Sequence, residues 1–227
     1  MELQFHHTIV QRIMWTLFIR VMARIILFLT TRRRVRGKEN IPRQGPLLIL
    51  SNHLSMADQF LLSASLNRKV VFMAKEELFR FRLIRHLAYG FGAFPVRRGG
   101  IMDRKALRQA NQVLDSGQAL GMFPEGMRSK NAQLQPAYPG SALIALHNGA
   151  PILPIGITGM EQLNKGIVWM LLHRPPVTVN IGCPFNLPPG NDKVTKVELV
   201  KLANYIMGHI AELLPPEYRG NYARCRD

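Results

Sequence analysis

The chain has 227 residues, 47% of them hydrophobic, which is enough for one domain with its own core but not comfortably for two. Thirty Lys and Arg against 14 Asp and Glu give a net charge of +16, and such a field attracts phosphate in nucleic acid, anionic lipid or a small substrate. The two cysteines, Cys183 and Cys225, form no CxxC pair, which disfavours a disulfide framework, a zinc knuckle and a cysteine nucleophile and favours a reducing, cytoplasmic-side location.

The first predicted element is an amphipathic helix over residues 8–31. Its charges form one narrow stripe because Arg12, Thr16, Arg20 and Arg24 follow one another at intervals of four, and apolar side chains fill the remaining face. This pattern is typical of a helix that lies in the membrane interface with its guanidinium groups at lipid phosphates. The arginines interrupt the apolar stretch well short of the roughly 20 residues that a spanning helix needs.

A basic run follows this helix and consists of Arg32, Arg33, Arg34, Arg36 and Lys38. Each charge adds about 1 kcal/mol of attraction to an anionic membrane surface. We therefore expect residues 1–36 to be a membrane-anchoring helix with a basic tail and residues 37–227 to be the folded domain. The alternative is a terminal helix that packs on the domain or on a second subunit. A secretory signal peptide does not fit, since its charges precede the apolar core and a small-residue cleavage site follows.

Short apolar strands alternate with helices in the rest of the chain. Strands are predicted over residues 46–53, 69–75, 93–98, 119–126, 151–159 and 177–185. Helices are predicted over 56–66, 76–90, 103–117, 141–150 and 192–216, the last capped by Asn191 or Asp192 and stopped by Pro215. This alternation predicts an α/β fold, a single domain with a mixed, mostly parallel β-sheet flanked by helices.

Polar or charged clusters follow the ends of four predicted strands, at residues 52–58, 74–75, 94–100 and 123–129. In α/β folds the ligand site gathers at strand ends and loops. The sequence therefore predicts that these clusters converge on one site.

Within the first cluster, His53 and Asp58 form a candidate dyad. A carboxylate bonded to one ring nitrogen fixes the tautomer and stabilises the imidazolium, which leaves the other nitrogen to take a proton. If the substrate brings its own hydroxyl, such a general base contributes about 10²- to 10⁴-fold in rate. Ser51 and Ser55 stand in no G-x-S-x-G elbow, so an acyl-enzyme is disfavoured. A metal site would need further ligands, and no H-E-x-x-H motif or carboxylate cluster supplies them.

The later clusters suit an anionic group. Arg97 and Arg98 precede two glycines, and Arg128 closely follows Glu125 and Gly126. Guanidinium groups donate to phosphate in a planar fork, and a glycine lets backbone N–H groups approach a phosphate or an oxyanion. Together with the dyad, these residues predict a general base that faces a phosphate-bearing alcohol.

Four segments, "NHLSMAD", "GAFPVRRG", "FPEGMRS" and "APILPIGI", resemble in order and spacing the sequence blocks of the glycerolipid acyltransferases typified by 1-acyl-sn-glycerol-3-phosphate acyltransferase. The match runs from about Gly37 to Glu161, more than half of the chain. An HxxxxD pair alone is a weak signal, but with FPEG about 70 residues later it is a strong one. The resemblance implies the glycerol-phosphate acyltransferase fold and transfer of a fatty acyl group from a thioester to the sn-2 hydroxyl of 1-acyl-glycerol-3-phosphate, which forms phosphatidic acid.

The resemblance also implies roles for single residues. His53 would deprotonate the lysophospholipid hydroxyl, and Asp58 would orient His53. Arg98 would hold the acceptor phosphate, with Lys75 and Arg128 as further candidates.

The third and fourth blocks supply the rest of the site. Glu125 and Gly126 would shape the acceptor site, and the backbone there would stabilise the tetrahedral oxyanion. Pro154 would be structural and line the acyl region. The remaining motif positions are Asn52, Ser55 and Pro124, the first two of which are expected to brace the turn around the dyad.

The reaction needs no metal or organic cofactor, because thiolate is a good leaving group. The expected partners are an anionic membrane surface, a lysophospholipid acceptor, and acyl-CoA or acyl-carrier protein as the donor, but no nucleic acid. The protein is expected to be peripheral or monotopic on the cytoplasmic face of a membrane.

Two positions depart from the family pattern, namely Met127, where threonine is common, and Arg97, where an acidic or neutral residue often stands. The added charge at Arg97 makes another acceptor possible, such as a glycolipid or an amino-acid lipid. A non-catalytic lipid-binding protein and a nucleic-acid binder are the alternatives from other classes.

Overall fold

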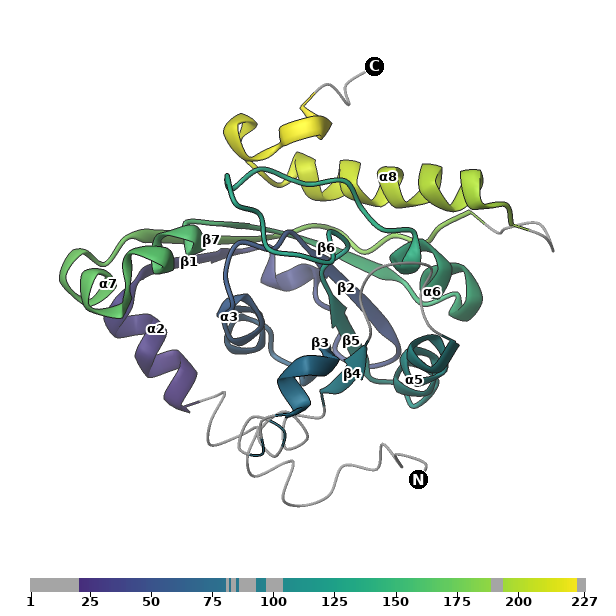
Figure 1. Cartoon of the computed structure of the whole chain (residues 1–227), viewed down its shortest axis with the longest axis horizontal. Coiled ribbons are helices and arrows are strands. Elements are labelled where there is room, and N and C mark those ends of the chain that lie inside the picture. Colours follow the sequence, from purple (N-terminus) through teal and green to yellow (C-terminus); the bar gives the residue numbers. More distant parts are fainter. Residues whose placement is uncertain are drawn as a thin grey trace.

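A seven-stranded β-sheet lies at the centre of the computed structural model, which describes residues 21–80, 82, 85, 93–96, 104–188 and 194–223 (Figure 1). The strands are β1 (Arg32–Arg36), β2 (Leu47–Ser51), β3 (Val70–Lys75), β4 (Phe94–Val96), β5 (Ala119–Met122), β6 (Ile152–Thr158) and β7 (Pro176–Ile181). Their spatial order is β1-β7-β6-β2-β5-β3-β4. The strands β6, β2, β5, β3 and β4 are parallel to one another. Strand β7 is antiparallel to β6, and β1 is parallel to β7. The predicted mixed, mostly parallel sheet is confirmed.

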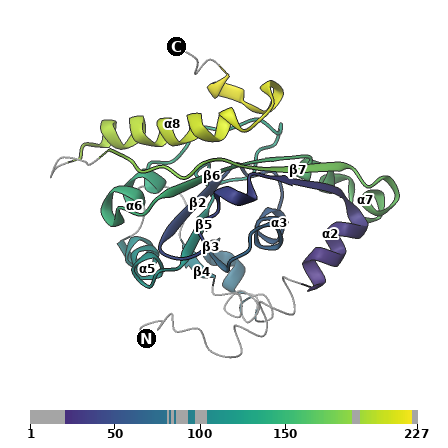
Figure 2. The same ribbon diagram turned by 180° about the vertical axis from the view of Figure 1, so that it is seen from behind.

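Helices cover both faces of this sheet, with α8 and α6 on one side and α3 on the other (Figures 1 and 2). The helices are α2 (Arg24–Thr30), α3 (Asp58–Ser65), α5 (Arg104–Asp115), α6 (Gly140–Asn148), α7 (Ile167–His173) and α8 (Lys196–Glu212). Short 3-10 turns are η2 (Lys38–Asn40), η3 (Glu76–Arg80), η4 (Met160–Lys165), η5 (Pro216–Tyr218) and η6 (Gly220–Tyr222).

The central strand β2 is buried on both faces because each face meets a helical layer. Leu48 and Leu50 point into a core shared with α5, α6 and α8, whereas Leu47 and Ile49 point into a second core with α2 and α3. This alternation follows from the two-residue period of a strand. The run of apolar residues before Asn52 is therefore the signature of a doubly covered strand.

Several predicted elements differ from the structure in their bounds. The predicted helix over 76–90 begins as the 3-10 turn η3, and most of its remainder lies outside the described residues. The final helix starts later than predicted, with Thr195 as its cap. Thr195 and Glu198 form a reciprocal capping box, which takes the place of the cap expected at Asn191 or Asp192. Helix α7 was not predicted, because its seven residues carry no capping signal.

The predicted basic tail is part of the sheet. Arg32–Arg36 form β1, which pairs in parallel with β7 from Arg32 opposite Pro176 onward. The first, third and fifth side chains are exposed, while Arg33 and Val35 are half-buried. The sheet thus begins before the predicted boundary at Gly37, because alternating exposure lets a charged segment serve as an edge strand, and charged edges resist pairing with other chains.

The predicted amphipathic helix is described from residue 21 onward, and residues 1–20 lie outside the described part of the chain. In α2, Ala23 and Leu27 are buried against the domain, and Arg24 Nε donates to the Ala64 carbonyl oxygen at 3.2 Å. This part of the helix therefore packs on the domain, and Arg24 contacts α3 rather than solvent alone. Within the described ranges, no helix has both the length and the apolar character needed to cross a membrane.

Gly37 joins β1 to η2, and its substitution tests how tightly the β1 edge of the sheet is packed. It has a φ of +76°, and an added Cβ would collide with the Ile181 carbonyl oxygen, which also accepts a hydrogen bond from Asn40 Nδ2 at 3.0 Å. Gly45 has a similar φ of +84° but open space around its Cβ. We expect Gly45→Ala to cost about 1 kcal/mol from backbone strain, and Gly37→Ala to cost about 2 kcal/mol more from the forced overlap. Urea denaturation measures both, and equal losses would contradict the packing at Gly37.

Candidate active site

Two of the predicted clusters meet at one edge of the sheet because parallel neighbours end on the same side. β2 leads into His53, and the adjacent β5 leads into Phe123. The backbone of Lys75 ends β3, which lies beside β5. Arg97 and Arg98 would follow β4 but lie outside the described residues. The structure thus brings the clusters at 52–58 and 123–129 together.

His53 and Asp58 are in direct contact, as the sequence predicts. His53 Nδ1 lies 2.8 Å from Asp58 Oδ2, and the same oxygen accepts the backbone N–H groups of Leu54 at 2.7 Å and Ser55 at 2.8 Å. Asp58 is fully buried and His53 is 6% exposed. Asp58 is the first residue of α3, where the helix dipole favours a negative charge. Three donors and the dipole hold the carboxylate in one position.

These contacts also determine the tautomer of His53. An ionised carboxylate can only accept hydrogen bonds, so Nδ1 carries the proton. Among the described residues, Nε2 has no hydrogen-bond partner. His53 therefore presents an unprotonated nitrogen that can accept a proton from a substrate.

Phe123 contacts the imidazole ring of His53 from the neighbouring loop, and Ser129 contacts its backbone. The Phe123 ring stacks on His53 with centroids 4.0 Å apart and planes at 10°. The Ser129 N–H donates to the His53 carbonyl oxygen at 2.8 Å. Sequence reasoning assigned neither residue a role, although both stand in the "FPEGMRS" segment. The loop after β5 thus holds His53 in place.

The Glu125 carboxylate is buried and accepts hydrogen bonds from backbone N–H groups. It is 1% exposed, and its Oε1 accepts the His53 N–H at 2.8 Å while Oε2 accepts the Gln135 N–H at 2.9 Å. Burial raises the pKa of the Glu125 carboxyl to about 7, although the two backbone donors lower it. Both carboxylate oxygens bond to the chain itself, and the role of Glu125 in shaping the acceptor site stays a prediction.

Gly126 and Arg128 follow in the same loop. Gly126 has a φ of +65°, and an added Cβ would press on the Tyr138 ring at 2.8 Å. Its N–H donates to the Phe123 carbonyl oxygen at 3.0 Å and closes the turn. The Gly126 N–H is therefore engaged within the loop rather than directed at an anion. Arg128 and Met127 are exposed.

The four supporting positions of the motifs are buried or tightly bonded. Asn52 Nδ2 donates to the Ile157 carbonyl oxygen at 2.8 Å, and its Oδ1 accepts the Ile157 N–H at 2.7 Å, so the side chain continues the pairing of β2 with β6. Ser55 Oγ accepts the Ala57 N–H at 3.2 Å within the turn. Pro124 and Pro154 are buried, and each accepts one backbone bond through its carbonyl oxygen.

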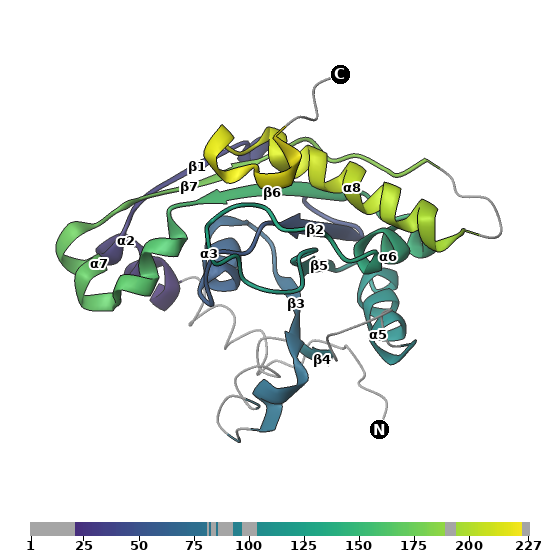
Figure 3. The same cartoon turned by 45° about the horizontal axis from the view of Figure 1, so that its top comes forward.

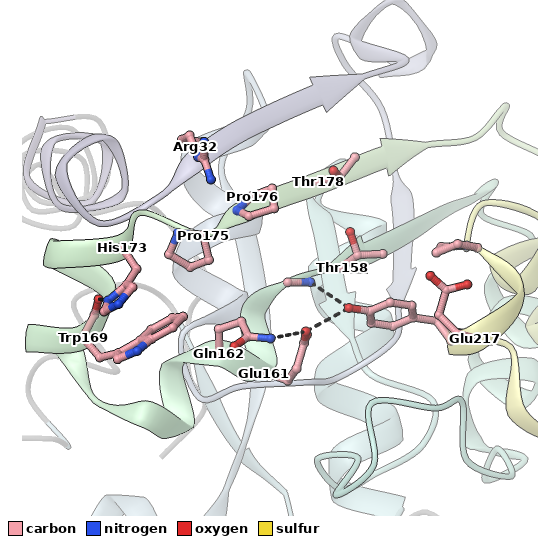
Figure 4. A pocket seen from close by; sticks show the side chains of 13 residues that line it. Arg32, Thr158, Glu161, Gln162, Trp169, His173, Pro175, Pro176, Thr178 and Glu217 are labelled. Carbon is pink, nitrogen blue, oxygen red and sulfur yellow. Dashed lines mark hydrogen bonds between the residues drawn. The ribbon is translucent and has the colours of Figure 1, made fainter.

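A separate cavity of about 590 Å³ lies beyond the end of β6 (Figure 4). Its wall includes Trp169 and His173 of α7, together with Tyr218, whose hydroxyl donates to Glu161 at 2.9 Å and accepts the Gly159 N–H at 3.3 Å. Burial and the Glu161 contact raise the pKa of Tyr218 to about 12. None of the predicted site residues lines this cavity.

The raised pKa of Glu125 predicts a pH-dependent stability. The group has a pKa of 4.5 when solvated and about 7 when folded, so the folded protein binds a proton that the unfolded chain releases between these values. The contribution of this group to stability is therefore full below pH 4.5 and is lost as the pH rises through about 7, by up to about 3 kcal/mol. Urea denaturation across this range should show a flatter profile in Glu125→Gln than in the wild type. Identical profiles would contradict the role of burial.

Known proteins show the same architecture. Residues 32–158 match the Acyltransferase family model. The chain is 29% identical over 186 residues to 1-acyl-sn-glycerol-3-phosphate acyltransferase BAT2, chloroplastic, of Brassica napus, covering 76% of this chain and 50% of that protein. It is 30% identical over 122 residues to 1-acyl-sn-glycerol-3-phosphate acyltransferase of Borreliella burgdorferi, covering 53% of this chain and 49% of that protein. The chain thus spans about half the length of these relatives.

A solved structure agrees with these matches. The crystal structure of the 1-acyl-sn-glycerophosphate (LPA) acyltransferase, PlsC, from Thermotoga maritima superposes with a TM-score of 0.69 at 25% identity, covering 89% of this chain and 79% of that one. Strands β1 to β6, the His53 turn and the loop after β5 lie within the matched residues 32–158, and β7 lies beyond them. The chain belongs to the acyltransferase family.

Proposed function

We propose that the protein transfers a fatty acyl group from a thioester to the sn-2 hydroxyl of 1-acyl-glycerol-3-phosphate and so forms phosphatidic acid. The observation that carries this proposal is the His53–Asp58 pair, in which Nδ1 is bonded to a buried carboxylate and Nε2 is left to accept a proton. The distant relatives named as 1-acyl-sn-glycerol-3-phosphate acyltransferases support the choice of acceptor.

The chemistry proceeds through one proton transfer in each direction. His53 Nε2 takes the proton of the acceptor hydroxyl as its oxygen attacks the thioester carbonyl carbon. The tetrahedral oxyanion then collapses, the carbon–sulfur bond breaks, and the imidazolium returns the proton to the leaving thiolate. Asp58 stabilises the imidazolium throughout, because its carboxylate is held by three donors. No metal or organic cofactor takes part in these steps.

Positive side chains near the strand ends would bind the acceptor phosphate. We assign this role to Arg98, with Lys75 and Arg128 as further ligands, because Lys75 ends β3 and the two arginines follow β4 and β5 along the edge that carries His53. Guanidinium groups bind phosphate through paired N–H donors. Glu125 would support the site by holding the backbone N–H of His53.

The acceptor and the product are both lipids, so we place the protein at the cytoplasmic face of a membrane as a peripheral or monotopic enzyme. The net charge of +16 would attract it to anionic phospholipid, and the acyl donor would be acyl-CoA or acyl-carrier protein. Residues 1–31 would anchor the chain, with the sheet beginning at Arg32.

His53→Ala should reduce acyl transfer by about 10²- to 10⁴-fold or more, since no other group takes the proton. The measurement is release of free thiol from acyl-CoA with lysophosphatidic acid as acceptor. His147→Ala is the matched control, because His147 is exposed on α6 and should leave turnover unchanged. A His53→Ala variant that stays folded by circular dichroism and keeps substantial turnover would sink the mechanism.

A panel of acceptors tests the proposed substrate. With one acyl-CoA, we expect turnover with 1-acyl-glycerol-3-phosphate to exceed that with monoacylglycerol by at least about tenfold, because the basic groups bind phosphate. Lysophospholipids with larger head groups, a lyso-glycolipid and a lyso-amino-acid lipid complete the panel. Preference for one of these would assign the enzyme to another acceptor, and the additional charge at Arg97 would then be the first position to examine.

A further inference from the structure

Exposed apolar side chains gather on α2 and α7. Ten of the sixteen large apolar residues that are exposed in the described part of the chain lie on these two helices or the turn before α2. They are Val21, Met22, Ile25, Ile26, Phe28, Leu29, Ile167, Val168, Leu171 and Leu172. Scattered apolar residues on a surface are ordinary, but a contiguous group of this size marks an interaction surface. We call these ten residues the α2–α7 surface.

The two helices form one continuous surface. Figures 1 and 3 place them together at the same end of the sheet, away from α5. Arg174, which follows α7, ties them by donating from Nη2 to the Phe28 carbonyl oxygen at 2.7 Å, and its guanidinium lies 5.4 Å from the centre of the Phe28 ring. Arg32 Nε in turn donates to the Arg174 carbonyl oxygen at 2.8 Å.

Helix α7 has two distinct sides. Trp169 and His173 line the cavity of Figure 4, and Met170 is buried. Val168 and Leu172 are 66% and 77% exposed, so the helix leaves its most apolar side to solvent. Packing on the domain explains the side with Trp169, Met170 and His173, but not the exposed apolar side with Val168 and Leu172.

The two segments that carry this surface have charges of one sign, although Glu161 and Glu217 line the cavity beside α7. The segments 21–36 and 165–174 contain no Asp or Glu, whereas both contain basic residues. These are Arg24, Arg32, Arg33, Arg34, Arg36, Lys165 and Arg174. An apolar surface rimmed by basic groups matches the interface of a bilayer that contains anionic lipid, where acyl chains lie beneath a layer of phosphates.

The surface also lies toward the edge of the sheet that carries the base. β6 and β2 are parallel neighbours, so the end of β6, which leads through η4 into α7, is at the same edge as His53. The start of β1, which follows α2, pairs with the start of β7 at this edge. A membrane bound to the α2–α7 surface would therefore lie on the side from which a lipid acceptor must come.

We propose that the α2–α7 surface docks on an anionic membrane, with α7 as a second membrane-contacting element beside the N-terminal segment. The lipid acceptor in this proposal rests on the proposed function, but the docking itself does not require turnover. We choose an anionic membrane as the partner because it accounts for both the apolar side chains and the basic residues, whereas a protein partner would not need both.

Sedimentation with vesicles tests the proposal. In the full chain, Val168→Glu/Leu172→Glu should lower the partition coefficient for phosphatidylglycerol vesicles by about tenfold or more, because two apolar contacts become charges of the same sign as the lipid. Val197→Glu is the matched control, since Val197 is 65% exposed on α8, outside the surface, and should change binding by less than about twofold. Wild-type binding should weaken with phosphatidylcholine vesicles and with added salt.

Two further measurements separate the possible outcomes. Turnover with a dispersed short-chain lysophospholipid should be unchanged in the double variant, which would show that folding and chemistry are intact. If the wild type binds vesicles but acylates no lysolipid, the proposed function fails and the docking stands. Unchanged vesicle binding in the double variant overturns the docking. If light scattering then shows that a wild-type dimer has become a monomer, the surface joins two copies of the chain instead.

Discussion

The buried Asp58 carboxylate is the interaction on which the site depends. A charge removed from water is costly unless donors replace the solvent, and the turn before α3 supplies two backbone N–H groups and the imidazole of His53. The donors come from residues 53–55, so the carboxylate both shapes the turn and orients the base. The same contact determines which nitrogen of His53 is protonated. The Asp58 carboxylate therefore determines both the shape of the turn and the protonation of the His53 ring.

The loop after β5 contributes a second buried carboxylate, that of Glu125. Glu125 is also buried, each of its oxygens accepts one backbone N–H, and burial raises its pKa to about 7. It ties the turn of His53 to the chain near Gln135, while Phe123 stacks on the imidazole. Glu125 thus joins the turn of His53 to the loop after β5, in addition to the hydrogen bond from the Ser129 N–H to the His53 carbonyl oxygen.

The strong positive charge of the chain has two structural uses. Part of it lies in β1, where alternating arginines cover the edge of the sheet. Arg24, Lys165 and Arg174 lie in or beside the two helices that carry the exposed apolar side chains. The side chains that would bind a phosphate follow the parallel strands at the edge that carries His53. The exposed apolar side chains and His53 therefore lie toward the same edge of the sheet.

The sequence by itself determined the alternation of strands and helices and the His53–Asp58 pair, because both arise from local patterns. An apolar run predicts a strand, and a spacing of five residues across a strand-to-helix turn brings two side chains within reach. The blocks of the acyltransferase family lie in the same local segments, so the family could also be inferred. The contact of Glu125 with the His53 backbone could not, since it joins residues 72 positions apart.

Only the tertiary structure decided the fate of Arg32–Arg36 and of α7. The arginine run reads as a solvated tail until β7 provides a partner strand, and this pairing depends on residues more than a hundred positions away. Helix α7 is too short to be recognised by periodicity or capping, and it exists because Met170 finds a buried position and α2 lies beside it. Local chemistry specified what the site contains, whereas long-range packing specified which surfaces the chain leaves open.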